Sequence, residues 1–362
     1  MTQEATRKGD SQIAAAAFRR QSSHKKRVIL GLVALAFVLA IIAINAGAAE
    51  TQPGQVLKAL LGLESGLSRV VIWNIRLPRI IAAIVAGAGL AAAGCVMQTS
   101  LRNPLASPFT LGISNAAAFG ANLAIIFFNA GTMHSSTQDA VFINNPYQVS
   151  LSAFLFALIA MILILYLARL RGFSPESVVL AGVAFGSLFG AGSTLIQYFA
   201  EDIQIAAMVF WTFGDLGRVS WQEGLILSAL TFVALVYFLL QRWNYNALEN
   251  GEDTARGLGV NVERVRFQSM LAASLVTAAA VSFMGIIGFI GLIAPQMMRR
   301  VLGIDHRFLL PASAATGAAL LLFTDTVART IISPVVLPVG AITSFFGAPL
   351  FIFILAKGSN RQ

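Results

Sequence analysis

Residues 251–266 read GEDTARGLGVNVERVR, a charged and helix-compatible stretch that is set between long apolar runs. Eight of the 25 residues from position 242 to position 266 are Asp, Glu, Lys or Arg, in a chain that is only 11% charged. Charge of this density cannot lie in hydrocarbon, so the stretch must sit in water between two membrane spans. A bare turn needs far fewer residues than this stretch contains. Its length therefore predicts a loop that folds and contacts another molecule. A plain solvated loop is the alternative.

The composition is that of a polytopic membrane protein. The 362 residues are 57% hydrophobic with a mean hydropathy of +0.77, whereas a soluble protein carries about 25% charged residues. Because a span takes roughly 20 apolar residues to cross about 30 Å of hydrocarbon, the sequence predicts an all-α fold with about ten transmembrane helices. The candidate spans are residues 28–48, 78–99, 111–129, 149–169, 177–197, 224–241, 267–284, 285–302, 308–328 and 339–356. The candidate at 285–302 is interrupted by Pro295.

The placement of Lys and Arg predicts which side of the chain faces the cytoplasm. If the basic tail is cytoplasmic, ten spans return the other terminus to the same side, and cytoplasmic segments then hold 19 of the 25 basic residues. The net charge of +9 comes mostly from this excess of basic residues on the cytoplasmic side, so it does not indicate a surface that binds nucleic acid. The predicted organisation is a basic cytoplasmic tail at 1–27, a transmembrane domain at 28–356 with the charged segment at 243–266, and a cytoplasmic tail at 357–362. The outer side keeps Lys58, Arg69, Arg76, Arg79, Arg218 and Arg329.

Motifs of common enzyme chemistry are missing from the sequence. It contains no G-x-x-x-x-G-K-[ST] phosphate loop, no H-E-x-x-H motif and no apparent Ser/His/Asp or paired-carboxylate constellation. Cys95 is the one cysteine and lies inside a span, and His24, His134 and His306 fall in predicted loops without metal-ligand spacing. We therefore expect no metal site, no cofactor held by this chain and no enzymatic activity of its own.

Two spans are rich in small residues. The second span contains AAIVAGAGLAAAG, a pattern that lets helix backbones approach closely. The fifth span places Gly182, Gly186 and Gly190 four residues apart, together with Ser187 and Gln197. Plain helix packing explains the second span. For the fifth span, packing and the wall of a water-filled path both remain open.

Several segments together resemble the membrane subunits of ABC importers for iron chelates, haem and vitamin B12, the type II importer family. The match covers roughly residues 55 to 356 and follows the order of the family's motifs. The segments are RLPR at 76–79, RNPLASP at 102–108 with LGIS at 111–114, WTFGDLGRVSW at 211–221, GEDTARGLGV at 251–260, GFIGLIAP at 288–295, and LPVG at 337–340 with GAP at 347–349. Gln296 departs from the family, which usually has His at this position, and the tail before residue 28 is longer and more basic than expected.

The resemblance implies a homodimer of ten-helix subunits in the cytoplasmic (inner) membrane, with the substrate path along the dimer axis and both termini in the cytoplasm. Two cytoplasmic ABC ATPase subunits would hold ATP and Mg²⁺, and an extracytoplasmic binding protein would deliver the cargo. The cargo would be an iron-siderophore, haem or cobalamin-type chelate, and the sequence does not separate these. No nucleic-acid partner is implied, and membrane lipid surrounds the spans.

The resemblance also assigns roles to residues of this chain. In the charged segment it implies that the ATPase contact is formed by Glu252, Ala255, Arg256, Gly257, Leu258 and Gly259. On the outer face it implies that Arg76, Arg79 and Arg329 meet acidic groups of the binding protein, where interfacial phosphate contacts are the alternative. An inner gate is expected where the fourth and fifth spans meet, at Ser174, Pro175, Glu176 and Ser177, and the pathway is expected along Gly186 and Gly190.

Asp325 supports a competing interpretation. It is the clear ionisable residue within a span, which is the usual sign of a functional site in a membrane protein, and a proton- or sodium-driven secondary transporter could use it. Arg329 lies four residues later, so the two side chains share a helix face and can pair instead. A membrane-embedded enzyme or an assembly scaffold is the other alternative, and we find no catalytic cluster for it.

Overall fold

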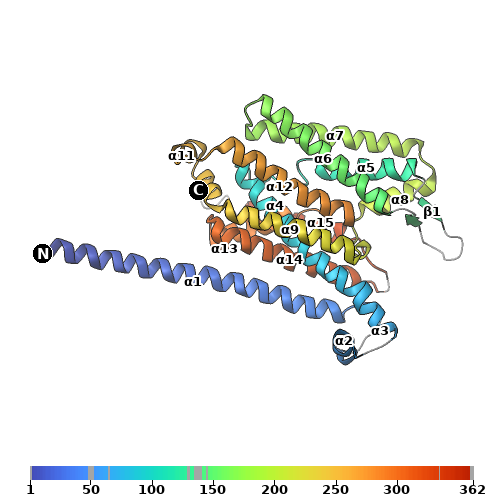
Figure 1. The fold of residues 1–362 in the computed structure, drawn as a ribbon, viewed down its shortest axis with the longest axis horizontal. Coiled ribbons are helices and arrows are strands. Elements are labelled where there is room, and N and C mark those ends of the chain that lie inside the picture. Colours follow the sequence, from blue (N-terminus) through green and yellow to red (C-terminus); the bar gives the residue numbers. More distant parts are fainter. Residues whose placement is uncertain are drawn as a thin grey trace.

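The computed structural model describes residues 2–47, 53–63, 66–128, 131–133, 141–143, 146–333 and 335–358. Helices make up nearly all of this part of the chain (Figure 1). Their bounds are α1 Thr2–Asn45, α2 Pro53–Leu60, α3 Leu67–Val70, the π-helix η1 Val71–Arg76, α4 Leu77–Ser100, α5 Ile113–Phe127, α6 Pro146–Leu170, α7 Pro175–Phe199, α8 Asp202–Thr212, the short helix η2 Leu216–Arg218, α9 Trp221–Leu240, α10 Arg242–Glu249, α11 Glu252–Gly257, α12 Val262–Met284, α13 Ile290–Leu302, α14 His306–Thr330 and α15 Val339–Gly358.

Each of the ten predicted spans contains one helix, namely α1, α4, α5, α6, α7, α9, α12, α13, α14 or α15. Within the described residues, seven of these are long and apolar enough to cross a membrane unaided, while α5 and α15 are shorter apolar helices. The prediction of an all-α membrane fold is confirmed. One short hairpin was not predicted, in which β1 (Gly131–Met133) pairs with β2 (Val141–Ile143) in antiparallel register.

The eighth span differs from its prediction. The helix α13 begins at Ile290, five residues later than expected, and has 13 residues. The interruption lies before the helix, where Gly285 (φ 75) and Phe289 (φ 65) adopt left-handed backbone conformations. Pro295 lies inside α13. The physical reason is that a left-handed residue ends one helix and re-aims the chain before the next helix starts.

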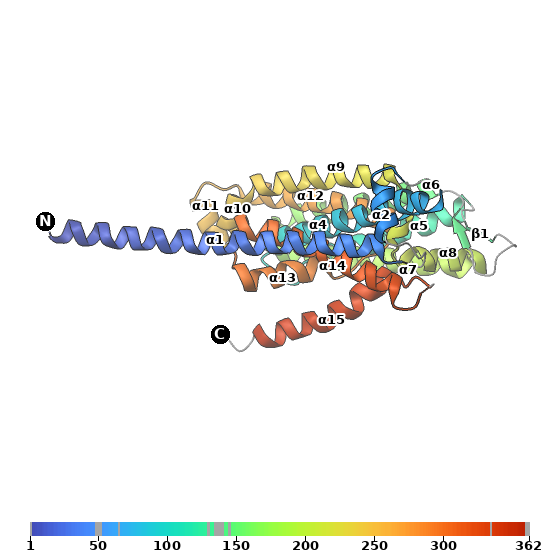
Figure 2. The same ribbon diagram turned by 90° about the horizontal axis from the view of Figure 1, so that it is seen from below.

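The helix α4 lies at the centre of the bundle and packs against α9, α12, α13 and α14 (Figures 1 and 2). A second group, α5, α6 and α7, joins this core through α12. Glycines let α4 approach its neighbours, because a Cβ on Gly87 would lie 2.4 Å from the carbonyl oxygen of Gly317 in α14. A Cβ on Gly94 would lie 1.7 Å from the carbonyl oxygen of Gly291 in α13. The packing function predicted for the small residues of the second span is confirmed.

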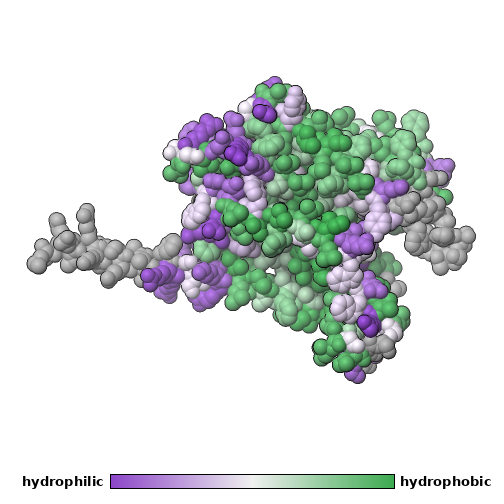
Figure 3. All heavy atoms as spheres, viewed as in Figure 1, coloured by the Kyte–Doolittle hydropathy of each residue, from purple (hydrophilic) through white to green (hydrophobic). Residues whose placement is uncertain are grey.

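The two ends of the bundle differ in their elements. The start of α1, the end of α15 and the helix α11 lie at one end, and α2, α3 and β1 lie at the other (Figures 1 and 2). Hydrophilic residues gather at the end that carries α11 and again near α2, with a hydrophobic band between them (Figure 3). The helix α1 runs from Thr2 in the predicted tail to Asn45 in the first predicted span as one continuous helix.

Candidate functional site

The charged segment that connects α9 to α12 folds into the two short helices α10 and α11. A Schellman motif ends α11, in which Val260 N–H donates to the Ala255 carbonyl at 3.0 Å and Gly259 N–H donates to the Arg256 carbonyl at 3.0 Å. Gly259 supplies the left-handed residue that this turn needs (φ +81). Gly257 is the last helical residue of α11, so the turn itself depends on Gly259.

Asn246 in α10 binds the start of α14. Its Nδ2 donates to Asp305 Oδ1 at 3.0 Å, and its Oδ1 accepts the backbone N–H of His306 at 2.8 Å. Burial raises the pKa of Asp305, but hydrogen bonds from Arg307 and Asn246 outweigh it and bring the pKa to about 2. The carboxylate is therefore ionised and caps α14. His306, predicted to lie in a loop, is the first residue of α14 and is fully buried.

Glu249, at the end of α10, binds two further spans. Its Oε1 accepts hydrogen bonds from Arg299 Nη1 of α13 at 2.6 Å and from the Thr99 hydroxyl of α4 at 2.7 Å. Arg299 Nη2 also donates to the same hydroxyl at 2.8 Å, which closes a triangle of charge-assisted bonds. The helix α10 is thus fixed to α4, α13 and α14 by side chains that the sequence analysis did not select.

The helix α11 is fixed to α12. Glu252 Oε1 accepts a hydrogen bond from Arg266 Nη2, and Glu252 Oε2 lies 3.7 Å from Arg256 Nη2. The helix α10 also contacts α12, because the hydroxyl group of Tyr245 in α10 lies 2.8 Å from that of Ser269 in α12. The position of Arg266 in the sequence could have identified it. It lies one residue before the predicted seventh span, where a charged side chain needs a partner.

The six residues predicted to contact the ATPase divide into two groups. Arg256 and Leu258 project outwards, with 59% of the Arg256 side chain and 70% of Leu258 exposed. Gly257 and Gly259 lie on the same exposed surface, which we call the α11 tip (residues 256–259). The other two, Glu252 and Ala255, face inwards, because Glu252 binds Arg266 and Ala255 is fully buried.

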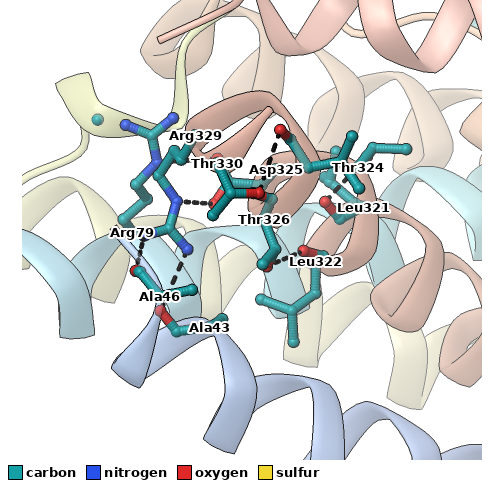
Figure 4. Close-up of polar contacts among 12 residues, drawn as sticks. Ala43, Ala46, Arg79, Leu321, Leu322, Thr324, Asp325, Thr326, Arg329 and Thr330 are labelled. Carbon is teal, nitrogen blue, oxygen red and sulfur yellow. Dashed lines mark hydrogen bonds and ion pairs between the residues drawn. The ribbon is translucent and has the colours of Figure 1, made fainter. Parts of the chain in front are cut away.

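At the opposite end of the bundle, two of the predicted docking arginines meet Asp325 (Figure 4). Arg79 Nε donates to Asp325 Oδ1 at 2.8 Å, and Arg329 Nε donates to Oδ2 at 3.0 Å. The Asp325 side chain is fully buried, and Arg79 also lies 3.2 Å from the half-exposed Asp215. The pairing of Asp325 with Arg329 that the four-residue spacing predicts is confirmed.

Arg76 and Arg329 also hold the end of α1. Arg76 Nη1 donates to the Ile44 carbonyl at 2.6 Å, and Arg329 donates to the carbonyls of Ala46 and Ala43 at 2.9 and 3.2 Å. The last carbonyls of a helix lack intrahelical donors and carry partial negative charge, which these guanidinium groups satisfy. No more than 7% of Arg76, Arg79 or Arg329 is exposed, so the structure places the three arginines inside the chain.

The predicted pathway residues lie on α7. Gly186 is buried against Gly112, the residue before α5, and its carbonyl accepts a hydrogen bond from Asn115 Nδ2 at 3.0 Å. Gly190 has no atom within 4 Å of the position that a Cβ would occupy. Of these two glycines, only Gly186 packs closely against another segment, while Ser187 lies exposed on another face of the helix. A role of this other face in a pathway stays a prediction.

The predicted gate segment is a capped helix start. Ser174 Oγ accepts the backbone N–H of Ser177 at 3.2 Å, and Ser177 Oγ donates to the Ser174 carbonyl at 2.8 Å. Pro175 occupies the first helical position and Glu176 is exposed in the first turn. These residues follow the turn at 171–173, which closes against α12. Their role as a gate stays a prediction.

Gln296, which stands where the family usually has His, links α13 to the centre of the bundle. Its Nε2 donates to Gln98 Oε1 of α4 and to the Pro104 carbonyl, both at 3.0 Å. Gln98 in turn donates to the Leu292 carbonyl at 3.2 Å. The amide therefore has a packing role in this chain.

The described structure is thus a helical bundle with seven helices long and apolar enough to span a membrane, in which the charged segment is fixed to α4, α12, α13 and α14. The chain belongs to the FecCD transport family, which it matches over residues 34–357. It is 56% identical to a protein named as an ABC transporter permease of Methanocaldococcus jannaschii, over 93% of this chain and 97% of the relative. It is 37% identical to the Fe(3+)-citrate import system permease YfmE of Bacillus subtilis, over 95% of this chain and all of the relative.

A solved structure described as an inward-facing conformation of a metal-chelate type ABC transporter has a TM-score of 0.77 and 29% identity to this chain. The alignment covers 92% of this chain and 99% of the solved one. Relatives named as hemin and vitamin B12 permeases match at 36% identity. The family and fold that the sequence motifs indicated are thereby confirmed.

Proposed function

We propose that this chain is the membrane subunit of an ATP-driven importer. In this proposal a second copy of the chain completes the path, two separate ATPase subunits bind at the α11 end and hydrolyse ATP with Mg²⁺, and a binding protein delivers cargo at the opposite end. The end with α11 and both chain termini then faces the cytoplasm, and the membrane is the cytoplasmic membrane. The cargo class is an iron-siderophore, haem or cobalamin-type chelate, by analogy with the relatives.

The observation that carries this proposal is the α11 tip. It exposes both Arg256 and Leu258 at the end of a helix that is itself fixed through Glu252 to a buried arginine. Arginine is enriched among interface hot spots, and the exposed Leu258 beside it adds apolar surface that a partner could cover. Because α10 and α11 are bound to α4, α12, α13 and α14, a push on the tip would move spans and would not be absorbed by a loose loop.

The structure gives no support to a gradient-driven carrier. Asp325, the residue on which that alternative depends, uses both carboxylate oxygens to bind Arg79 and Arg329. Its side chain is fully buried in packed helices. It acts as the counter-charge of two arginines.

The proposal predicts that the paired substitution Arg256→Glu and Leu258→Asp abolishes assembly with the ATPase. We expect at least about 30-fold weaker binding, which corresponds to the roughly 2 kcal/mol typical of one hot-spot residue. The chain would be co-expressed with the ATPase and binding protein encoded by neighbouring genes, and the complex would be purified in mild detergent. ATPase activity would then be measured with and without the binding protein.

Arg264→Glu is the matched control, because Arg264 is exposed at the same end of the molecule but lies outside the α11 tip. It should leave assembly unchanged. An unsubstituted chain that folds but recruits no ATPase would contradict the proposed function itself. Full assembly of the doubly substituted chain would contradict only the assignment of the tip.

A further inference from the structure

Arg266 is the largest fully buried side chain in the described part of the structure, with 2% of its surface exposed. It lies in the first turns of α12, at the end of the bundle that carries α11. A guanidinium cannot be neutralised by losing its proton in a protein, so a buried arginine has to be paired and hydrogen-bonded. The partners of Arg266 are therefore part of how this end of the molecule is organised.

Three N–H groups of Arg266 bind three different segments. Nε donates to the carbonyl of Ser100, the last residue of α4, at 2.7 Å. Nη1 donates to the carbonyl of Phe173 in the turn between α6 and α7, and Nη2 donates to Glu252 Oε1 at the start of α11. Because the guanidinium is planar and rigid, these three bonds fix the positions of the three segments relative to one another.

The turn at residues 171–173 is held in a conformation that it would not keep alone. Gly172 and Phe173 both have positive φ values, of 66° and 55°, and such a backbone is unfavourable for a bulky residue like Phe. The Phe173 ring is buried and packs edge-on against Phe267 of α12 at 5.9 Å between centroids. The strained residue is thus held by two consecutive residues of α12, by Arg266 through its carbonyl and by Phe267 through its ring.

Glu252 is the carboxylate that balances Arg266. Only 26% of its side chain is exposed, and both of its oxygens face arginines, with the second at 3.7 Å from Arg256. If α11 moves, Glu252 either leaves Arg266 as a buried charge without a counter-charge or draws Arg266 with it. The first outcome is costly, and the second removes the donor from the Phe173 carbonyl.

We propose that the Glu252–Arg266 pair transmits movement of α11 to the turn between α6 and α7, with Arg266 as the positioning residue that holds this turn in the present state. The inference rests on the proposed function, in which the ATPase moves α11. It extends that function by naming the connection between the ATPase surface and the segment at 174–177 that starts α7. A passive brace would stabilise the same residues without making the turn respond to nucleotide.

A spin label on Arg171→Cys reports the position of the turn. Arg171 is exposed two residues before Phe173, and the one native cysteine, Cys95, is buried and inaccessible to the label. The full complex with ATPase and binding protein would be placed in lipid nanodiscs. The distance between the labels of the two copies would be measured without nucleotide and with ATP plus vanadate, and uptake per ATP hydrolysed would be measured in liposomes.

Two substitutions test the pair. Glu252→Gln removes the charge but keeps the size. Arg266→Lys keeps the charge but replaces a rigid fork of three donor nitrogens, each on a different segment, by one flexible ammonium nitrogen. Both are expected to abolish the nucleotide-dependent change in label distance. Both should also lower uptake per ATP about tenfold, within the usual range of coupling between two sites. Complex assembly is expected to persist, because neither residue lies in the α11 tip.

Glu263→Gln and Arg264→Lys are the matched controls, since both residues are exposed in the first turn of α12 and form no ion pair within the described residues. They should behave as the unsubstituted chain. If Glu252→Gln and Arg266→Lys lower thermal stability but keep the nucleotide-dependent distance change, the pair is only a brace and the inference is overturned. If the unsubstituted complex shows no ATP-driven uptake, the proposed function fails, and the inference fails with it for that separate reason.

Discussion

Replacement of Gly94 by alanine is expected to prevent α4 from packing on α13 and to reduce the yield of folded protein to near zero. The added Cβ would lie 1.7 Å from the carbonyl oxygen of Gly291 and 2.5 Å from its carbonyl carbon. Both are backbone atoms that cannot rotate away. The cost should therefore exceed the roughly 1–3 kcal/mol of an ordinary overpacked core, which is a large part of the about 5–15 kcal/mol that stabilises a typical protein.

Gly31→Ala is the control for this substitution. Gly31 lies in α1 with nothing within 4 Å of the position that a Cβ would occupy, so alanine should be neutral or gain up to about 1 kcal/mol from helix propensity. The two variants would be compared by the amount of monodisperse protein in detergent and by the midpoint of thermal unfolding. A Gly94→Ala protein with normal yield and an unchanged midpoint would show that α4 and α13 can separate without penalty.

The substitution Asp325→Asn is expected to destabilise the protein by about 3–5 kcal/mol, the cost of leaving a buried charge without its partner. Arg79 and Arg329 would both lose their shared carboxylate, and no more than 7% of either residue is exposed. Protein level and the thermal midpoint should both fall. In contrast, the pH profile of whatever uptake remains should keep its shape.

Asp215→Asn is the matched control, because Asp215 also pairs with Arg79 but 41% of its side chain is exposed. Solvent screens this ion pair. The side-chain oxygen of asparagine can also still accept the hydrogen bond from Gly217 N–H that Asp215 Oδ1 accepts at 2.9 Å. We expect a much smaller change. Normal levels of the Asp325→Asn protein together with a shifted pH profile would favour the proton-driven carrier over the ATP-driven importer.

The sequence contains enough local information to place the spans and the charged segment. Hydropathy is a property of consecutive residues, so ten helices were located, and the eighth was misplaced only where two left-handed residues re-aim the chain. Burial of the arginines was not predictable in the same way. Arg79 binds Asp325 across 246 positions of sequence, and a charge at the end of a span looks the same whether it faces solvent or another helix.

The connections of the charged segment were also beyond local prediction. Arg266 binds carbonyls 166 and 93 positions earlier in the chain, and backbone carbonyls carry no side-chain signal at all. Motif resemblance selected Glu252 and Ala255 because of their place in the segment. Only the folded structure separates these inward-facing residues from Arg256 and Leu258, which share the same motif but face outwards.

The arginines at the end of α1 have a consequence for the order in which the protein is made. The helix α1 leaves the ribosome well before α14, yet two of the carbonyls at its end accept hydrogen bonds from Arg329, 283 and 286 positions later. At about 5–20 residues per second, roughly 15–60 s of synthesis separate the two segments. During that interval Arg76 is the nearer of the two arginines that bind this end, only 32 positions from its acceptor. Among the described helices, α1 is thus made early, but the hydrogen bonds at its end are complete only after α14 has been synthesised.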